Sequence, residues 1–102
     1  MRWFEEWEVE GLDGELVRML DEARTRAKVP FELTSSFRAN DPRAHGRGTA
    51  VDVRCTKSYN RMKIVSGAIL AGFRRIGVYD CHVHLDNDRK LPQDVMWWGV
   101  SK

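Results

Sequence analysis

Residues 78–86 read VYDCHVHLD, and this segment carries the clearest indication of a β-strand in the chain. Side chains on a strand alternate between its two faces. A single strand from Arg75 to about Leu85 would place an apolar set on one face: Tyr79, Cys81, Val83 and Leu85. The other face would then carry Asp80, His82, His84 and Asp86. Four ionisable groups in a row are unsuited to a core, so this strand is predicted to line a polar cleft. An exposed strand face with incidental histidines is the alternative.

The same alternation predicts a strand over residues 50–55, which read AVDVRC. Its apolar face would carry Val51, Val53 and Cys55, and the opposite face Asp52 and Arg54. Short strands are also expected over 31–35, which leads into a loop rich in Gly, Pro, Asn and Ser, and over 95–100, which follows the turn segment DNDRKLPQD.

Two helices are predicted between these strands. Apolar residues at helical spacing run from Leu12 to Ala27, with Asp13 as the N-cap and Pro30 as the stop signal. A second helix is expected from Ser58, with Gly72 near its C-cap. Its inward stripe is predicted to consist of Met62, Val65, Ile69 and either Gly72 or Phe73.

The order helix, two strands, helix, two strands indicates an α+β fold. The economical arrangement is a small antiparallel sheet with both helices packed on one face. A chain of 102 residues fits one domain, so we expect a single domain over 1–102.

Composition excludes several classes of function. Lys and Arg total 17 against 15 Asp and Glu, a balance too mild to favour nucleic acid. No run approaches the roughly 20 apolar residues that cross a bilayer, so no membrane partner is expected. Residues 1–10 carry acids where a signal peptide needs an apolar run, so synthesis in the cytoplasm is expected. Cys55 and Cys81 are then expected to be free, buried thiols.

The histidines point to a metal. The chain has three, and two lie in HVH at 82–84. The third, His45, opens HGRGTAVD, a loop that runs into the strand carrying Asp52. Histidine and carboxylate are ligands that catalytic zinc takes, and three of them leave a fourth position for water. We therefore expect a Zn²⁺ site.

Five segments together resemble one known family. They are LTSSFR (33–38), HGRGTAVDV (45–53), GFRRIGVY (72–79), HVHLD (82–86) and PQDVMW (92–97). In order and spacing they are similar to the zinc D-alanyl-D-alanine carboxypeptidases, peptidoglycan metallopeptidases that include bacteriophage endolysins and share a fold with the hedgehog signalling domain. The resemblance spans about residues 12–98.

The resemblance implies roles for individual residues. His45, Asp52 and His84 match the zinc ligands, and Arg38 matches an arginine that holds a substrate carbonyl or carboxylate. The general base is left open. Relatives usually place an acid where this chain has Cys81, so Asp80 is the first choice.

Other residues remain open for supporting roles. His82 is a second possible base, and Asp86 could instead orient a ligand histidine. Arg43 and Arg47 are further choices for holding a terminal carboxylate. Trp97 and Trp98 are expected to wall the cleft or to pack elsewhere.

The implied activity is zinc-dependent hydrolysis of D-alanine-containing peptidoglycan stem peptides. Carboxypeptidase and endopeptidase both remain open, as do a phage and a bacterial origin. We expect a monomer that acts on the bacterial cell wall if it is a phage lysin. The alternative is a non-catalytic, zinc-stabilised binding or structural module of the same fold.

Overall fold

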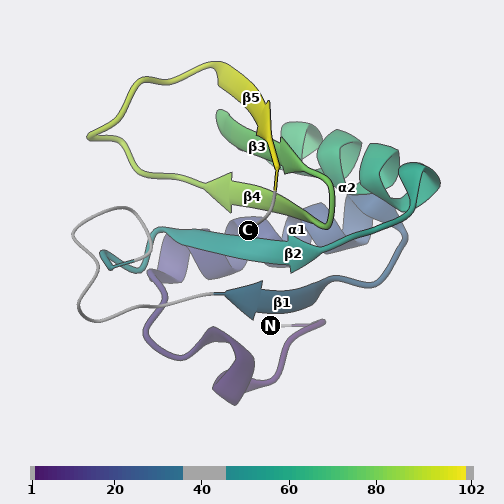
Figure 1. Ribbon diagram of the computed structural model, residues 1–102. Helices are drawn as coiled ribbons and strands as arrows, with labels where there is room; N and C mark the ends of the chain where they lie inside the picture. Colours follow the sequence, from purple (N-terminus) through teal and green to yellow (C-terminus); the bar gives the residue numbers. More distant parts are fainter. Residues whose placement is uncertain (1, 36–45, 101–102) are drawn as a thin grey trace.

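The computed structural model describes residues 2–35 and 46–100. Its elements follow the order η1 (Glu6–Val9), α1 (Gly14–Ala27), β1 (Glu32–Ser35), β2 (Ala50–Arg54), α2 (Ser58–Leu70), β3 (Arg75–Tyr79), β4 (His82–Asp86) and β5 (Val95–Gly99). Helices and one sheet share a single hydrophobic cluster, which confirms the α+β class (Figure 1).

The described strands form a five-stranded mixed sheet in the order β1-β2-β4-β3-β5. The pairs β1–β2, β2–β4 and β3–β4 are antiparallel, as predicted, but β5 lies parallel to β3. The prediction of an antiparallel sheet is therefore wrong at this edge. Since β4 is already paired on both sides, the returning chain adds beyond β3, and both β3 and β5 run opposite to β4.

The predicted strand from Arg75 to Leu85 is two strands joined by a tight turn at Asp80 and Cys81. The turn lacks the Asn-Gly or Asp-Gly pair that usually marks a two-residue hairpin, so no residue pattern predicted it. It changes which face Tyr79 occupies, and it leaves Cys81 exposed, contrary to the prediction of a buried thiol. Cys55 is buried, and both thiols are free as expected.

Helix α1 begins as predicted, with the Asp13 carboxylate accepting a hydrogen bond from the Leu16 amide. It ends before Pro30, because Lys28 adopts the left-handed conformation (φ 61°) and donates its amide to Arg24. Such a residue closes a helix by satisfying a terminal carbonyl.

The predicted inward stripe of α2 is wrong at two of its residues, whereas Phe73 is buried and Val65 packs against the core. Met62 and Ile69 are exposed, and the buried residues are Ile64, Gly67 and Ala68. A Cβ at Gly67 would stand 2.6 Å from the Ala23 carbonyl oxygen of α1. The two helices thus meet through small residues, which a search for large apolar side chains overlooks. The N-cap is Lys57, not Ser58, and Gly72 has the positive φ expected of the residue that follows a helix.

Both helices lie behind the sheet in Figure 1 and bury one of its faces. Fully buried side chains from α1, α2, β2 and β4 build this core: Leu16, Leu20, Ile64, Val51, Val53, Val83 and Leu85. The opposite face of the sheet therefore bears the alternate residues of the same strands.

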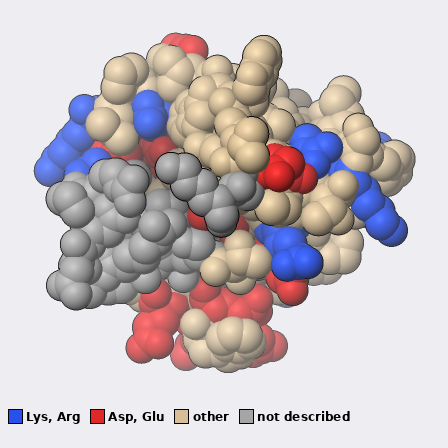
Figure 2. Space-filling view, in the orientation of Figure 1, with Lys and Arg blue, Asp and Glu red and all other residues tan. Residues whose placement is uncertain are grey.

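The N-terminal segment lies along the outside of α1. The Trp3 indole donates to the Thr25 hydroxyl, and Phe4 is buried. Figure 2 shows acidic side chains gathered at the lower edge of the molecule, where Figure 1 places η1. Trp7 in this segment is exposed. Across residues 2–35 and 46–100, none of the helices combines the length and the apolar character that a bilayer crossing needs.

Candidate metal centre

Strands β2 and β4 bring two of the predicted ligands together on the open face. Asp52 and His84 are register partners in the antiparallel ladder. Oδ1 of Asp52 lies 3.3 Å from Nδ1 of His84. The two side chains are 13% and 15% exposed, so the pair is shielded yet reachable from solvent.

The spacing of these two atoms fits a shared metal ion. Ligands of tetrahedral zinc lie about 2.0–2.1 Å from the metal, which places two ligand atoms about 3.3 Å apart. The observed 3.3 Å equals that separation. It is longer than the usual N–H···O hydrogen bond of about 2.9–3.0 Å. The donor types, imidazole and carboxylate, also fit zinc.

Asp86 supports His84 from the other side of the ring. Its Oδ2 lies 2.7 Å from Nε2 of His84, and the residue is only 1% exposed. A carboxylate behind a ligand histidine is the usual outer partner of a metal site. This contact agrees with the role that the sequence analysis offered for Asp86, namely to orient a ligand histidine.

The pKa of His84 lies above its ordinary value. Burial lowers this pKa, but hydrogen bonds to Asp52 and Asp86, together with their negative charges, outweigh burial. Without a metal, the pair of carboxylates therefore favours a protonated imidazole.

His82 stands beside the pair on the same face. Its Nε2 lies 3.8 Å from Oδ1 of Asp52, and its side chain is 22% exposed. The ring stacks on Tyr79, with centroids 4.3 Å apart and planes within 12°. The hairpin places these two residues side by side, so the prediction that Tyr79 faces the core is wrong.

Trp97 of β5 forms an aromatic wall with Tyr79. The indole Nε1 donates to the Tyr79 hydroxyl at 3.0 Å, and the ring centroid lies 5.4 Å from that of His84. Gly77 lies under the indole, where a Cβ would come within 2.7 Å of it. Trp98 is 87% exposed. Of the two tryptophans, Trp97 alone contacts the centre.

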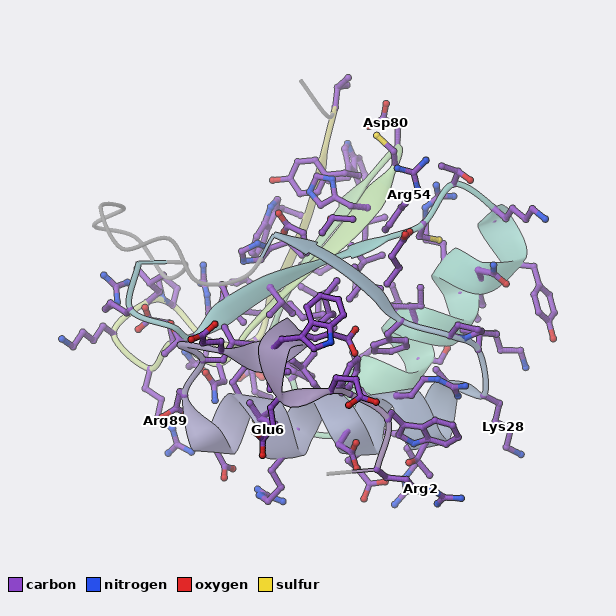
Figure 3. All side chains as sticks on the ribbon, turned by 90° about the horizontal axis from the view of Figure 1, so that it is seen from below. Arg2, Glu6, Lys28, Arg54, Asp80 and Arg89 are labelled. Atoms are coloured by element: carbon purple, nitrogen blue, oxygen red, sulfur yellow. The ribbon has the colours of Figure 1, made fainter. Side chains whose placement is uncertain are left out.

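Asp80 lies in the hairpin turn and not on the strand face that alternation predicted. It is exposed, and the thiol of Cys81 lies 3.8 Å from its Oδ1. Figure 3 shows it at the tip of the hairpin. Its role as general base stays a prediction, and the turn has weakened the geometric reason for it.

Three predicted site residues, Arg38, Arg43 and His45, lie outside the described residues. The described part of the chain contains no group of three His, Cys, Asp or Glu side chains that could hold a metal. Asp52 and His84 thus form two donors of the predicted set, and the third predicted donor is His45.

The segment after His45 is anchored close to the end of β4. Arg47 forms an ion pair with Asp88, which is 3% exposed and also accepts from the Thr49 hydroxyl. Burial raises the pKa of Asp88, but the Lys90 amide and Arg47 outweigh it and lower the pKa. Arg47 is the one of the three candidate arginines that lies in the described residues, and its ion pair with Asp88 competes with binding of a substrate carboxylate.

Three features of this centre were missed by sequence reasoning. They are Arg75, which binds Asp86, the site-facing Tyr79, and the glycine beneath Trp97. If the turn at Asp80 had been predicted, Tyr79 would have been placed on the open face beside His82. Comparison of the chain with protein-family models, curated proteins and solved structures gives no match.

Proposed function

We propose that this chain is a zinc-dependent peptidase of the hedgehog/DD-peptidase fold that hydrolyses D-alanine-containing peptidoglycan stem peptides. The proposal of a metal is supported by the 3.3 Å distance between Oδ1 of Asp52 and Nδ1 of His84, and by the contact of Asp86 with the other nitrogen of the same ring. The substrate class rests on the family resemblance of the sequence. As a cell-wall peptidase, the protein would act as a carboxypeptidase or an endopeptidase, including as a phage lysin.

The metal would be held by His45, Asp52 and His84. Zinc supplies Lewis acidity toward a peptide carbonyl and activates water for attack at neutral pH. Asp52 contributes negative charge to the centre, and Asp86 keeps the His84 ring in place.

His82 is the described residue best placed to accept a proton from the attacking water. It shares the open face with His84, and its Nε2 points toward Asp52. The stacked Tyr79 ring fixes its orientation. A positioned imidazole is the commonest general base in enzymes.

The surrounding residues would hold the peptide. Trp97 and Tyr79 give a flat apolar wall beside the metal position, suited to small side chains such as that of alanine. Arg38 would bind a carbonyl or carboxylate through its planar fork of donors.

A matched pair of histidine variants tests the proposal. Purified wild type should contain one zinc per chain and release D-alanine or a cut peptide from defined stem peptides, as read by mass spectrometry. His84→Gln should lose both zinc and cleavage. His82→Gln should keep zinc and lose cleavage, because it removes the base and not a ligand. Absence of zinc in the wild type under all loading conditions would refute the proposal.

The second candidate is a non-catalytic, zinc-stabilised binding module. The position of Asp80 favours it, because the exposed turn removes an acid from the ligand row. Wild type that binds one zinc yet leaves every stem peptide intact would support this module. Equal cleavage by the wild type and by His82→Gln would support the peptidase activity but would contradict the role of His82 as its general base.

A further inference from the structure

Arg75, at the start of β3, links three parts of the candidate centre. Its Nε donates to Oδ1 of Asp86 at 2.8 Å, and its Nη1 donates to the Pro92 carbonyl at 2.6 Å. The guanidinium carbon also lies 5.2 Å from the centroid of the Trp97 ring. Only 12% of the side chain is exposed. Because Arg75 is the register partner of Asp86, it lies on the same open face as the candidate centre, and it is largely shielded from solvent there.

The two oxygens of Asp86 have separate partners. Oδ1 accepts from Arg75 and from the Asp88 amide at 3.1 Å, while Oδ2 lies 2.7 Å from Nε2 of His84. A carboxylate can turn about its last bond, and two donors on one oxygen restrict that turn. The orientation of Oδ2 toward the imidazole is thus set from the side opposite the metal position.

This arrangement favours one tautomer of the neutral His84 imidazole, because Oδ2 of Asp86 lies 2.7 Å from Nε2 whereas Oδ1 of Asp52 lies 3.3 Å from Nδ1. A carboxylate only accepts hydrogen bonds, so Nε2 of His84 must be the donor to Asp86. In a neutral imidazole the other nitrogen then has the free lone pair. That nitrogen is Nδ1, which faces Asp52.

We propose that Arg75 is a positioning residue of the metal centre: through Asp86 it holds His84 with Nε2 protonated and Nδ1 directed at the metal position beside Asp52. The inference rests on the metal site of the proposed function and is independent of the substrate. It also explains an arginine at this place, because only a fork of donors reaches Asp86 and the Pro92 carbonyl together.

Zinc affinity, measured by competition with a coloured chelator, tests the role of Arg75. Loss of an outer partner of a ligand histidine typically costs about 10–100-fold in metal affinity. We expect a loss in this range for Arg75→Met and a smaller loss for Arg75→Lys, which keeps the charge but not the fork. Arg74→Met is the matched control. Arg74 is exposed, pairs with Asp94, and should leave the affinity unchanged.

Asp86→Asn provides a second test that keeps the shape of the side chain. Arg75 and the Asp88 amide both need an acceptor, so the amide oxygen should take the Oδ1 position. The NH₂ group would then face Nε2 of His84 and disfavour its protonation. We expect a loss of zinc affinity at least as large as that of Arg75→Met. Circular dichroism of each metal-free variant identifies any that fail to fold.

A spectroscopic measurement separates positioning from a general effect on stability. Long-range ¹H–¹⁵N spectra of the zinc-loaded wild type should show His84 protonated on Nε2 and not on Nδ1. The reverse pattern would overturn the proposal. Wild-type zinc affinity in a folded Arg75→Met or Asp86→Asn protein would also overturn it.

The outcomes distinguish this inference from the proposed function. If the wild type binds zinc and the variants weaken it, the inference stands even where no stem peptide is cleaved. If the wild type cleaves peptides and both variants bind zinc normally, the inference fails and the proposed function stands. A wild type that binds no zinc refutes both.

Discussion

The two faces of the β2–β4 ladder differ in their burial and in the polarity of their side chains. One face meets the helices through Val51, Val53, Val83 and Leu85, each with no solvent exposure. The other carries Asp52, His82 and His84, partly exposed and in contact through their polar atoms. Neighbouring residues in the sequence thus belong to different environments, 180° apart on the strand.

The contrast between the two faces explains how a small domain can hold a cluster of charged side chains that is costly to bury. The covered face supplies apolar burial, which favours folding in proportion to its area. The open face contributes hydrogen bonds and charge pairs whose net effect on stability is small. Substitutions on the two faces should therefore separate stability from chemistry.

The largest expected effect is on the covered face. Leu85→Ala removes a fully buried side chain, so the free energy of unfolding should fall by about 2–5 kcal/mol. Urea denaturation in the presence of a chelator measures this change. Leu70→Ala, at a 64% exposed position, is the control and should change it by less than about 0.5 kcal/mol. A smaller loss at Leu85 than at Leu70 would contradict the assignment of the core.

The second effect is a pH dependence from the open face. The folded pKa of His84 is raised from 6.5, so its protonated form stabilises the metal-free protein. That contribution is complete below the unfolded pKa of 6.5 and is lost as pH rises through the higher folded pKa. Within residues 2–35 and 46–100, His84 is faced by Asp52 on β2, Asp86 on β4 and Trp97 on β5, and His82 contacts Asp52 beside it.

The melting temperature of the metal-free protein should fall between about pH 6 and pH 9 as this stabilisation is lost. Added zinc should restore the melting temperature at the high end of this range, because the metal binds the neutral imidazole. In the His84→Gln variant, the melting temperature of the metal-free protein should depend less on pH over this range. An unchanged slope in that variant would assign the pH dependence to other groups.

The smallest effect on stability is expected at Gly77. An alanine Cβ would come within 2.7 Å of the Trp97 ring, so Gly77→Ala should shift the indole away from His84. Because the ring is at the sheet edge and can move, the unfolding free energy should change by about 1 kcal/mol. The KM for a stem peptide should rise more than zinc affinity falls. Gly14→Ala, where a Cβ has open space, is the control.

The sequence predicted the two faces of β2 and β4 correctly because alternation is a local property of a strand. Asp52 and His84 could be placed on one face in this way, but their pairing required the register of the ladder. Alternation failed between Tyr79 and His82, where a turn without a glycine reverses the chain. Met62 and Ile69 were wrongly assigned to the buried face of α2, because that face is built around Gly67, which packs closely without being large. Arg75 could not be found, since its partner Asp86 is 11 residues away and looks like any strand carboxylate.

The edge position of β5 has a consequence for the order in which the centre comes apart. β5 is paired to β3 alone in the strand order, whereas β2 and β4 lie inside the sheet and hold Asp52 and His84. Edge elements with exposed side chains open first in native-state fluctuations, well before global unfolding. Fraying of β5 would carry Trp97 away while the metal-facing pair stays together. Trp97 should therefore leave the centre in openings that keep Asp52 and His84 together. The amide hydrogens of β5 should accordingly exchange with solvent faster than those of β2 and β4.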